Sequence, residues 1–101
     1  MAWTRVASVQ DLEAQGVLGV EAGGEDIALY WLDGAAYATT NICTHAYARV
    51  SEGFVDGDCI ECPVHQALFK IKTGEVISGP AGAPLKTYPC RTEGGDVLVD
   101  I

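Results

Sequence analysis

Apolar residues along this chain occur in short runs separated by glycine-rich turns, which is the pattern of a β protein. The clearest run covers residues 27–32, where both alternating sets of side chains are apolar. A short strand with two apolar faces is predicted to be buried on both of them. The Gly-Gly pair at 23–24 and the Asp-Gly pair at 33–34 flank this run and predict two hairpin turns.

The rest of the pattern predicts further strands around a middle segment rich in Gly and Pro. One helical turn is expected over residues 9–14, with Ser8 as its N-cap and Asp11 three residues later. The fold class that follows is all-β: a single domain over residues 1–101, built as an antiparallel β-sandwich with a small inserted subdomain at about 41–84. Strands are expected over residues 3–6, 17–21, 36–39, 54–55, 59–61, 68–71, 75–77, 85–90 and 97–101.

The charge balance limits the possible partners. The 101 residues include 14 acidic and 6 basic ones, for a formal net charge of −8. We expect no nucleic-acid partner, because phosphate binding needs a basic face. Nor do we expect a membrane partner, because there is no apolar run of about 18 residues and no signal-peptide pattern. A cytoplasmic location is therefore expected.

Cysteine and histidine residues form two short clusters in the middle segment. The chain has four cysteines, Cys43, Cys59, Cys62 and Cys90, and without a secretion signal they are expected to be reduced or metal-bound. Its two histidines fall beside two of them, giving Cys43-x-His45 and Cys62-x-x-His65 with sixteen residues between the clusters. Cys59 and Cys90 are expected to be small apolar residues of strands.

These four side chains predict a metal centre. Thiolates suit iron held by sulfide, imidazoles add nitrogen ligands, and a mixed [2Fe-2S] cluster takes two of each. Two other interpretations remain open at this point. A structural zinc site also uses two cysteines and two histidines, and Cys59-x-x-Cys62 has the spacing of a dithiol redox pair.

The residues around the ligands resemble the Rieske motif. They are Asn-Ile-Cys-Thr-His at 41–45 and Ile-Glu-Cys-Pro-Val-His-Gln-Ala-Leu-Phe at 60–69, and the resemblance extends over almost the whole chain. It implies the Rieske fold and one Rieske-type [2Fe-2S] cluster bound by Cys43, His45, Cys62 and His65. No histidine is left for a second iron site, so an electron carrier is expected and not an enzyme.

Residues 28–30 and 86–89 resemble the ferredoxin components of bacterial aromatic-ring dioxygenases, most closely the naphthalene-dioxygenase type. This resemblance implies two protein partners. A flavin-dependent NAD(P)H reductase would donate electrons, and a terminal Rieske non-haem iron oxygenase would accept them. The alternative within the family is the small Rieske subunit or carrier of another redox system, such as an assimilatory nitrite reductase.

Four positions differ from the high-potential members of the Rieske family. Ala48 and Val64 stand where those relatives carry a disulfide, and Ala67 and Phe69 stand where they carry a serine and a tyrosine. Without hydroxyl donors to the cluster sulfurs, the reduced cluster is stabilised less, so we expect a potential on the order of −150 mV. Tyr47 also departs from the usual motif, and the sequence assigns it no role.

Overall fold

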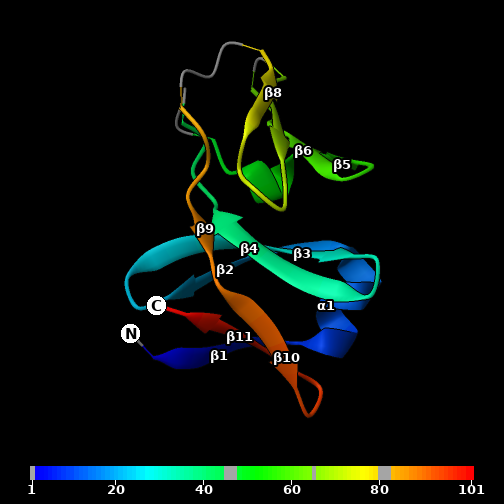
Figure 1. The fold of residues 1–101 in the computed structure, drawn as a ribbon, viewed down its shortest axis with the longest axis vertical. Coiled ribbons are helices and arrows are strands. Elements are labelled where there is room, and N and C mark those ends of the chain that lie inside the picture. The colour runs from blue at the N-terminus through cyan, green and yellow to red at the C-terminus, as the bar shows by residue number, and fades with distance from the viewer. Residues whose placement is uncertain (1, 45–47, 65, 80–82) are drawn as a thin grey trace.

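The computed structural model describes residues 2–44, 48–64, 66–79 and 83–101, and it consists mainly of three antiparallel sheets (Figure 1). The predicted all-β class is confirmed. We call the first two sheets, together with helix α1, the base, and the third sheet the small sheet. Their strands are β1 (Trp3–Ser8), β11 (Asp96–Asp100) and β10 (Cys90–Glu93); β2 (Val17–Ala22), β3 (Glu25–Leu32), β4 (Ala35–Thr40) and β9 (Thr87–Tyr88); β5 (Phe54–Asp56), β6 (Cys59–Glu61), β7 (Leu68–Lys70) and β8 (Val76–Ser78).

Strand β3 separates two hydrophobic cores. Ile27 and Leu29 face the core of the base, whereas Ala28 and Tyr30 face a second core beneath the small sheet. All four side chains are fully buried, as the two apolar faces of this strand predicted. The small sheet therefore rests on the back of a strand that also belongs to the base.

Hairpin turns define the register of the base strands. Gly23 and Gly24 have φ of 57° and 78°, and Asp33 and Gly34 have φ of 52° and 78°. Two successive left-handed residues are the geometry of a type I′ turn, whose twist matches that of antiparallel strands. Both predicted hairpins are confirmed, and they align β2 with β3 and β3 with β4 over six residue pairs each.

Helix α1 (Val9–Gln15) closes one end of the base. The Ser8 hydroxyl oxygen accepts a hydrogen bond of 3.1 Å from the Asp11 N–H, as the predicted N-cap requires. Gly16 ends the helix with φ of 81°, and its N–H donates to the Leu12 carbonyl. Leu12 is fully buried in the base core, so this short helix is anchored by one large apolar side chain.

The single strand expected over residues 85–90 is wrong. The chain forms β9 and β10 there, which pair with β4 and β11 in different sheets. Pro89 lies between them and has no N–H to continue a ladder, so the chain crosses from one sheet to the other at this residue. Strand β8 also differs slightly from the expected range, since it begins at Val76 and includes Ser78.

One further sequence expectation concerned membrane spans. Across the part of the chain that the structure describes, no helix is long and apolar enough to cross a bilayer.

Candidate metal centre

Two loops begin at the predicted cysteine ligands, and each is closed by a backbone hydrogen bond between its ends. We call these closed ends the necks of the loops. The Cys43 N–H donates to the Ala48 carbonyl at 2.8 Å, and the Cys62 N–H donates to the Ala67 carbonyl at 2.8 Å. Each bond closes the neck of a loop that contains one predicted cysteine and one predicted histidine. His45, Tyr47 and His65 lie outside the described residues, so the structure describes the cysteine half of the predicted ligand set.

The two cysteine side chains meet in the core beneath the small sheet. Cys43 is 4% exposed, Cys62 is fully buried, and their thiols are in hydrogen-bonding contact. Burial raises the pKa of the Cys62 thiol to about 11, and the neighbouring Cys43 thiol adds to this rise. Buried sulfurs become charged readily only beside a positive group, which makes this pair suited to a metal centre that favours thiolate ligands, such as an iron–sulfur cluster.

The second loop also provides a donor to one of these sulfurs. The backbone N–H of Val64 donates to the Cys62 sulfur, and this bond lowers the pKa of the thiol against the larger effect of burial. A backbone N–H beside a ligating sulfur stabilises negative charge on it. Two buried, adjacent sulfurs with a backbone donor therefore fit an iron–sulfur cluster on the cysteine side.

Apolar groups fill the positions where high-potential relatives carry cluster-modifying side chains. Ala67 and Phe69 are fully buried in the same core as both thiols, and neither has a hydroxyl. Ala48 is 8% exposed and Val64 is 36% exposed, and neither can form a disulfide. At these four positions the side chains are therefore apolar and carry no hydroxyl.

Two residues that follow β8, Gly79 and Ala83, each lie against one of the two loops. The Thr44 hydroxyl donates to the Ala83 carbonyl at 2.7 Å. At the other end, a Cβ on Gly79 would lie 2.7 Å from Ala67 Cα, and Gly79 has φ of 94°. Only glycine combines that backbone angle with such a close approach. The two predicted ligand loops are therefore supported from the side by residues far along the chain.

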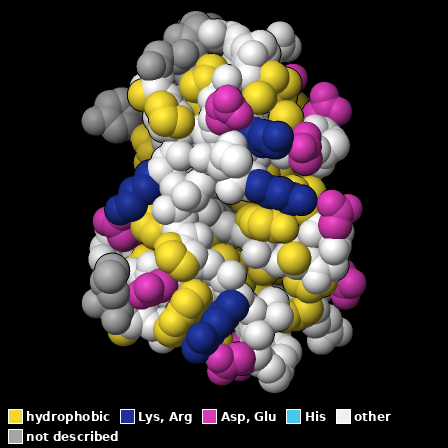
Figure 2. All heavy atoms as spheres, in the orientation of Figure 1, with side chains coloured by type: hydrophobic (Ala, Val, Ile, Leu, Met, Phe, Trp, Pro, Cys, Tyr) yellow, Lys and Arg dark blue, Asp and Glu magenta, His cyan; other side chains and the backbone are white. Residues whose placement is uncertain are grey.

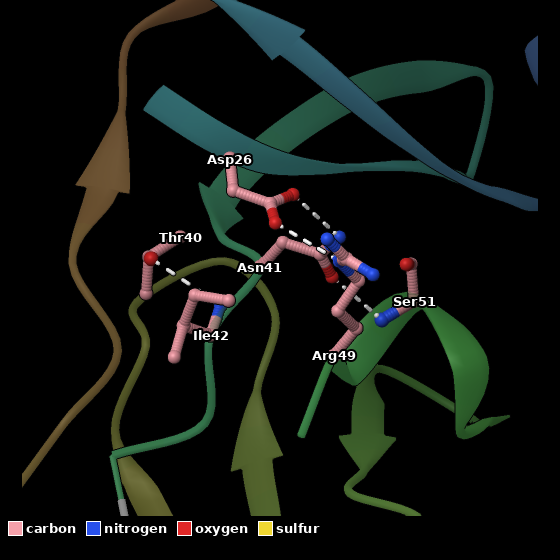
Figure 3. A network of polar contacts seen from close by, with 6 residues as sticks. All are labelled: Asp26, Thr40, Asn41, Ile42, Arg49 and Ser51. Carbon is pink, nitrogen blue, oxygen red and sulfur yellow. Dashed lines mark hydrogen bonds and ion pairs between the residues drawn. The ribbon is translucent and has the colours of Figure 1, made fainter. Parts of the chain in front are cut away.

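A partly buried polar network connects the first loop to the base (Figure 3). Asn41 is 1% exposed, and its amide bonds both Asp26 in β3 and the backbone of Ser51. Burial alone raises the pKa of Asp26, but hydrogen bonds from Asn41 and Arg49 and the charge of Arg49 lower it below the ordinary value of 3.8. The sequence analysis missed this network, because its members are 10 to 23 residues apart and follow no motif.

The other two cysteines occupy strands, as expected. Cys59 lies in β6, where its thiol donates to the Asp58 carboxylate at 3.5 Å, and burial with this carboxylate raises its pKa. Cys90 begins β10, and burial raises the pKa of its thiol to about 11. The thiol that Cys62 contacts is that of Cys43, which favours a metal centre over a Cys59–Cys62 dithiol pair.

Known proteins resemble this chain over almost its full length. The ferredoxin component of the naphthalene 1,2-dioxygenase system of Pseudomonas aeruginosa is 41% identical over 99 residues, which cover 98% of this chain and 95% of that protein. The structure of the Sphingomonas yanoikuyae B1 ferredoxin matches with a TM-score of 0.92 and 35% identity, covering 99% of both chains. A ferredoxin chain in a complex of reduced oxygenase and oxidized ferredoxin in carbazole 1,9a-dioxygenase matches with a TM-score of 0.88 and 36% identity, covering 96% of this chain and 91% of that one.

These similarities confirm the expected Rieske fold, and they agree with a match of the family model for the Rieske [2Fe-2S] domain to residues 2–89. They also decide between the two metals, because this family binds one Rieske-type [2Fe-2S] cluster. The matched necks, the paired buried thiols and the family model point to the same conclusion. The chain belongs to the Rieske [2Fe-2S] family.

Proposed function

We propose that this chain is a one-electron carrier of an aromatic-ring dioxygenase system. Cys43 and Cys62 bind one iron of its [2Fe-2S] cluster, and His45 and His65 bind the other. The observation that carries this proposal is the contact between two buried thiols at the necks of two matching loops. The cluster-binding subdomain covers about residues 41–84 of a single domain, 1–101, and the small sheet lies within it.

When bound, the cluster supplies reversible storage of one electron. The protein contributes a dry, apolar environment for the cysteine sulfurs and the Val64 N–H that stabilises charge on one of them. Ala67 and Phe69 add no hydroxyl donor. This environment supports a potential on the order of −150 mV, at the low end of the Rieske range.

The proposed partners are a flavin-dependent NAD(P)H reductase and a terminal Rieske non-haem iron oxygenase. The relatives named above are ferredoxin components, and one was solved in complex with its oxygenase. The net charge of −8 suits attraction to basic surfaces on both partners. A carrier must also leave after each transfer, so both encounters are weak and fast. All three proteins work together in the cytoplasm.

The first test is spectroscopic. The purified holoprotein should be red-brown, contain iron and acid-labile sulfide in the ratio of a [2Fe-2S] cluster, and give a Rieske EPR signal after reduction. A colourless protein with stoichiometric zinc would overturn the proposal. A redox titration with a clearly positive midpoint would contradict the low potential, while leaving the cluster assignment intact.

The second test is catalytic. Purified flavin reductase and naphthalene-type dioxygenase should form a cis-dihydrodiol from naphthalene, molecular oxygen, NADH and a proton, with release of NAD⁺, only when this chain is added. The Cys62→Ala variant is the matched control and should not restore turnover. If the chain is reduced by the reductase but supports a nitrite reductase and no dioxygenase, the proposed partner is wrong.

A further inference from the structure

The side chain of Asn41 lies where the base meets the first ligand loop (Figure 3). Its Nδ2 donates to Asp26 Oδ1 at 2.9 Å, and its Oδ1 accepts from the Ser51 N–H at 2.8 Å. The residue is 1% exposed. A buried amide with both ends paired holds its partners in a fixed arrangement, because losing either bond leaves an unpaired polar group.

The backbone of Asn41 makes two more hydrogen bonds, one to β3 and one to the chain after the loop. Its N–H donates to the Asp26 carbonyl at 2.8 Å, and its carbonyl accepts from the Val50 N–H at 2.8 Å. Asn41 precedes Cys43 by two residues, and Val50 follows Ala48 by two. One residue therefore connects the strand before the loop, the chain after the loop and β3 of the base.

Asp26 receives hydrogen bonds from both arms of the first loop. Besides the amide of Asn41, it accepts a bond of 3.0 Å from Arg49 Nε at its second carboxylate oxygen. Arg49 also forms a β-bridge with Ile42, so the two ends of the loop are paired with each other. A single carboxylate on β3 thus ties both ends of the loop to the base.

Gly19 in β2 leaves the space that this arrangement needs. A Cβ at Gly19 would lie 2.9 Å from Asn41 Nδ2 and 2.7 Å from the Ser51 hydroxyl oxygen. Both distances are shorter than the contacts that real Cβ atoms make, so both the amide and the hydroxyl would have to move. The strand beside the network is therefore shaped around the Asn41 side chain.

We propose that Asn41 is a positioning residue for the metal centre: its amide fixes the first ligand loop on the base, and with it the place of Cys43 relative to Cys62. The inference rests on the proposed assignment of both cysteines as ligands. Cys62 directly follows β6 of the small sheet, whereas Cys43 lies two residues after Asn41. Loosening that anchor changes the relation between the two sulfurs without removing a ligand.

The test compares Asn41→Ala with Leu12→Ala in the holoprotein. Leu12 is fully buried in the base core, so its truncation destabilises the fold away from the network. For Asn41→Ala we expect broadened and shifted EPR g-values, a changed midpoint potential and cluster loss to a chelator about tenfold faster or more. Leu12→Ala should lower the unfolding temperature and leave the g-values and the potential unchanged.

A wild-type EPR spectrum and release rate in Asn41→Ala would overturn the inference, and so would equal spectral changes in Leu12→Ala. Gly19→Ala serves as a second variant in case Asn41→Ala does not fold, because it keeps the amide and only displaces it. We expect changes in the same direction and smaller; an unchanged g-tensor there would also overturn the inference. If the wild-type protein itself gives no Rieske signal, the proposed function fails instead, which separates the two results.

Discussion

The base and the small sheet differ in the length of their strands. Base strands β2, β3 and β4 contain six, eight and six residues, whereas each of the four strands of the small sheet contains three. Both cores contain aliphatic and aromatic side chains, and the core beneath the small sheet also includes the thiols of Cys43 and Cys62. Such short strands are marginal without another source of stability. We therefore expect the small sheet to depend more on its metal centre than the base does.

The two regions are nevertheless coupled through one strand. β3 contributes Leu29 to the base core and Tyr30 to the core beneath the small sheet. The Tyr30 hydroxyl forms a buried hydrogen bond of 2.8 Å with Thr39 in the neighbouring strand β4. Strand β3 thus belongs to both cores, and substitutions on its two faces should affect the two regions separately.

Loss of a cysteine ligand should have the largest effect. In Cys62→Ala we expect no cluster and fast amide hydrogen exchange across β5–β8, with slow exchange retained in β2, β3 and β4. Visible absorption and hydrogen exchange followed by mass spectrometry measure both results. Cys59→Ala, three residues earlier, is the matched control and should keep its colour. Equal loss of protection in both regions would show that the base also needs the cluster.

Replacing one predicted ligand by a ligand of another type should alter the spectroscopic properties of the cluster without preventing its assembly. In His65→Cys, a third thiolate replaces an imidazole, so the Rieske EPR signal should disappear even if the protein stays coloured. The potential should also fall, because thiolate adds negative charge. An unchanged EPR spectrum would contradict the assignment of His65.

Truncation on the base face of β3 should destabilise the fold without touching the centre. Leu29→Ala removes a fully buried side chain, and we expect the free energy of unfolding to fall by about 2–5 kcal/mol. Urea unfolding of the holoprotein measures the loss, and EPR at low urea should match the wild type. A changed g-tensor would mean that the two cores are less separate than β3 makes them.

Hydroxyl groups added beside the sulfurs should raise the reduction potential. Phe69 and Ala67 are fully buried in the core that holds both thiols, so Phe69→Tyr and Ala67→Ser should move the midpoint to more positive values. Phe54→Tyr makes the same chemical change at a side chain that is 66% exposed and should leave the midpoint unchanged. Redox titration compares the three variants, and no shift in either buried variant would refute the explanation given for the low potential.

The smallest effect should come from acid. The pKa of Asp26 lies below 3.8 in the folded protein, so its stabilising contribution is present above that pH and is lost as the pH falls through the folded value. The difference in urea midpoint between the wild type and Asp26→Asn should therefore stay constant above about pH 5 and shrink as the pH falls below 3.8. Asp96→Asn removes a comparable ion pair with Arg5 in the base and provides the control for general charge effects. A constant difference below pH 3.8 would show that Asp26 is not charged in the network.

The sequence predicts the parts of the fold that depend on neighbouring residues. Hairpin turns, the cap at Ser8 and the two buried faces of β3 all follow from local patterns, and the structure confirms them. The ligand assignment followed from spacing and motif resemblance. The structure brings together Cys43 and Cys62, while the assignment of His45 and His65 stays a prediction.

Long-range relations were not predictable in the same way. Nothing near Pro89 shows that β9 and β10 belong to different sheets, because that depends on which distant strands offer free edges. The contacts of Asn41 reach Asp26 and Ser51 across the fold, and an asparagine before a loop is otherwise an ordinary turn residue. Pairings set by tertiary packing leave little trace in a single sequence.

The two ends of the described chain are hydrogen-bonded to each other. The Ala2 N–H donates to the Ile101 carbonyl at 3.0 Å, and the Ile101 N–H donates to the Ala2 carbonyl at 3.2 Å. Figure 1 shows both ends beside β1 and β11, on the part of the molecule away from β5–β8. A linker attached at either residue would hold the protein on an electrode surface with β5–β8 directed away from that surface. Attachment through the base would then allow electron transfer to be measured with the protein in one defined orientation.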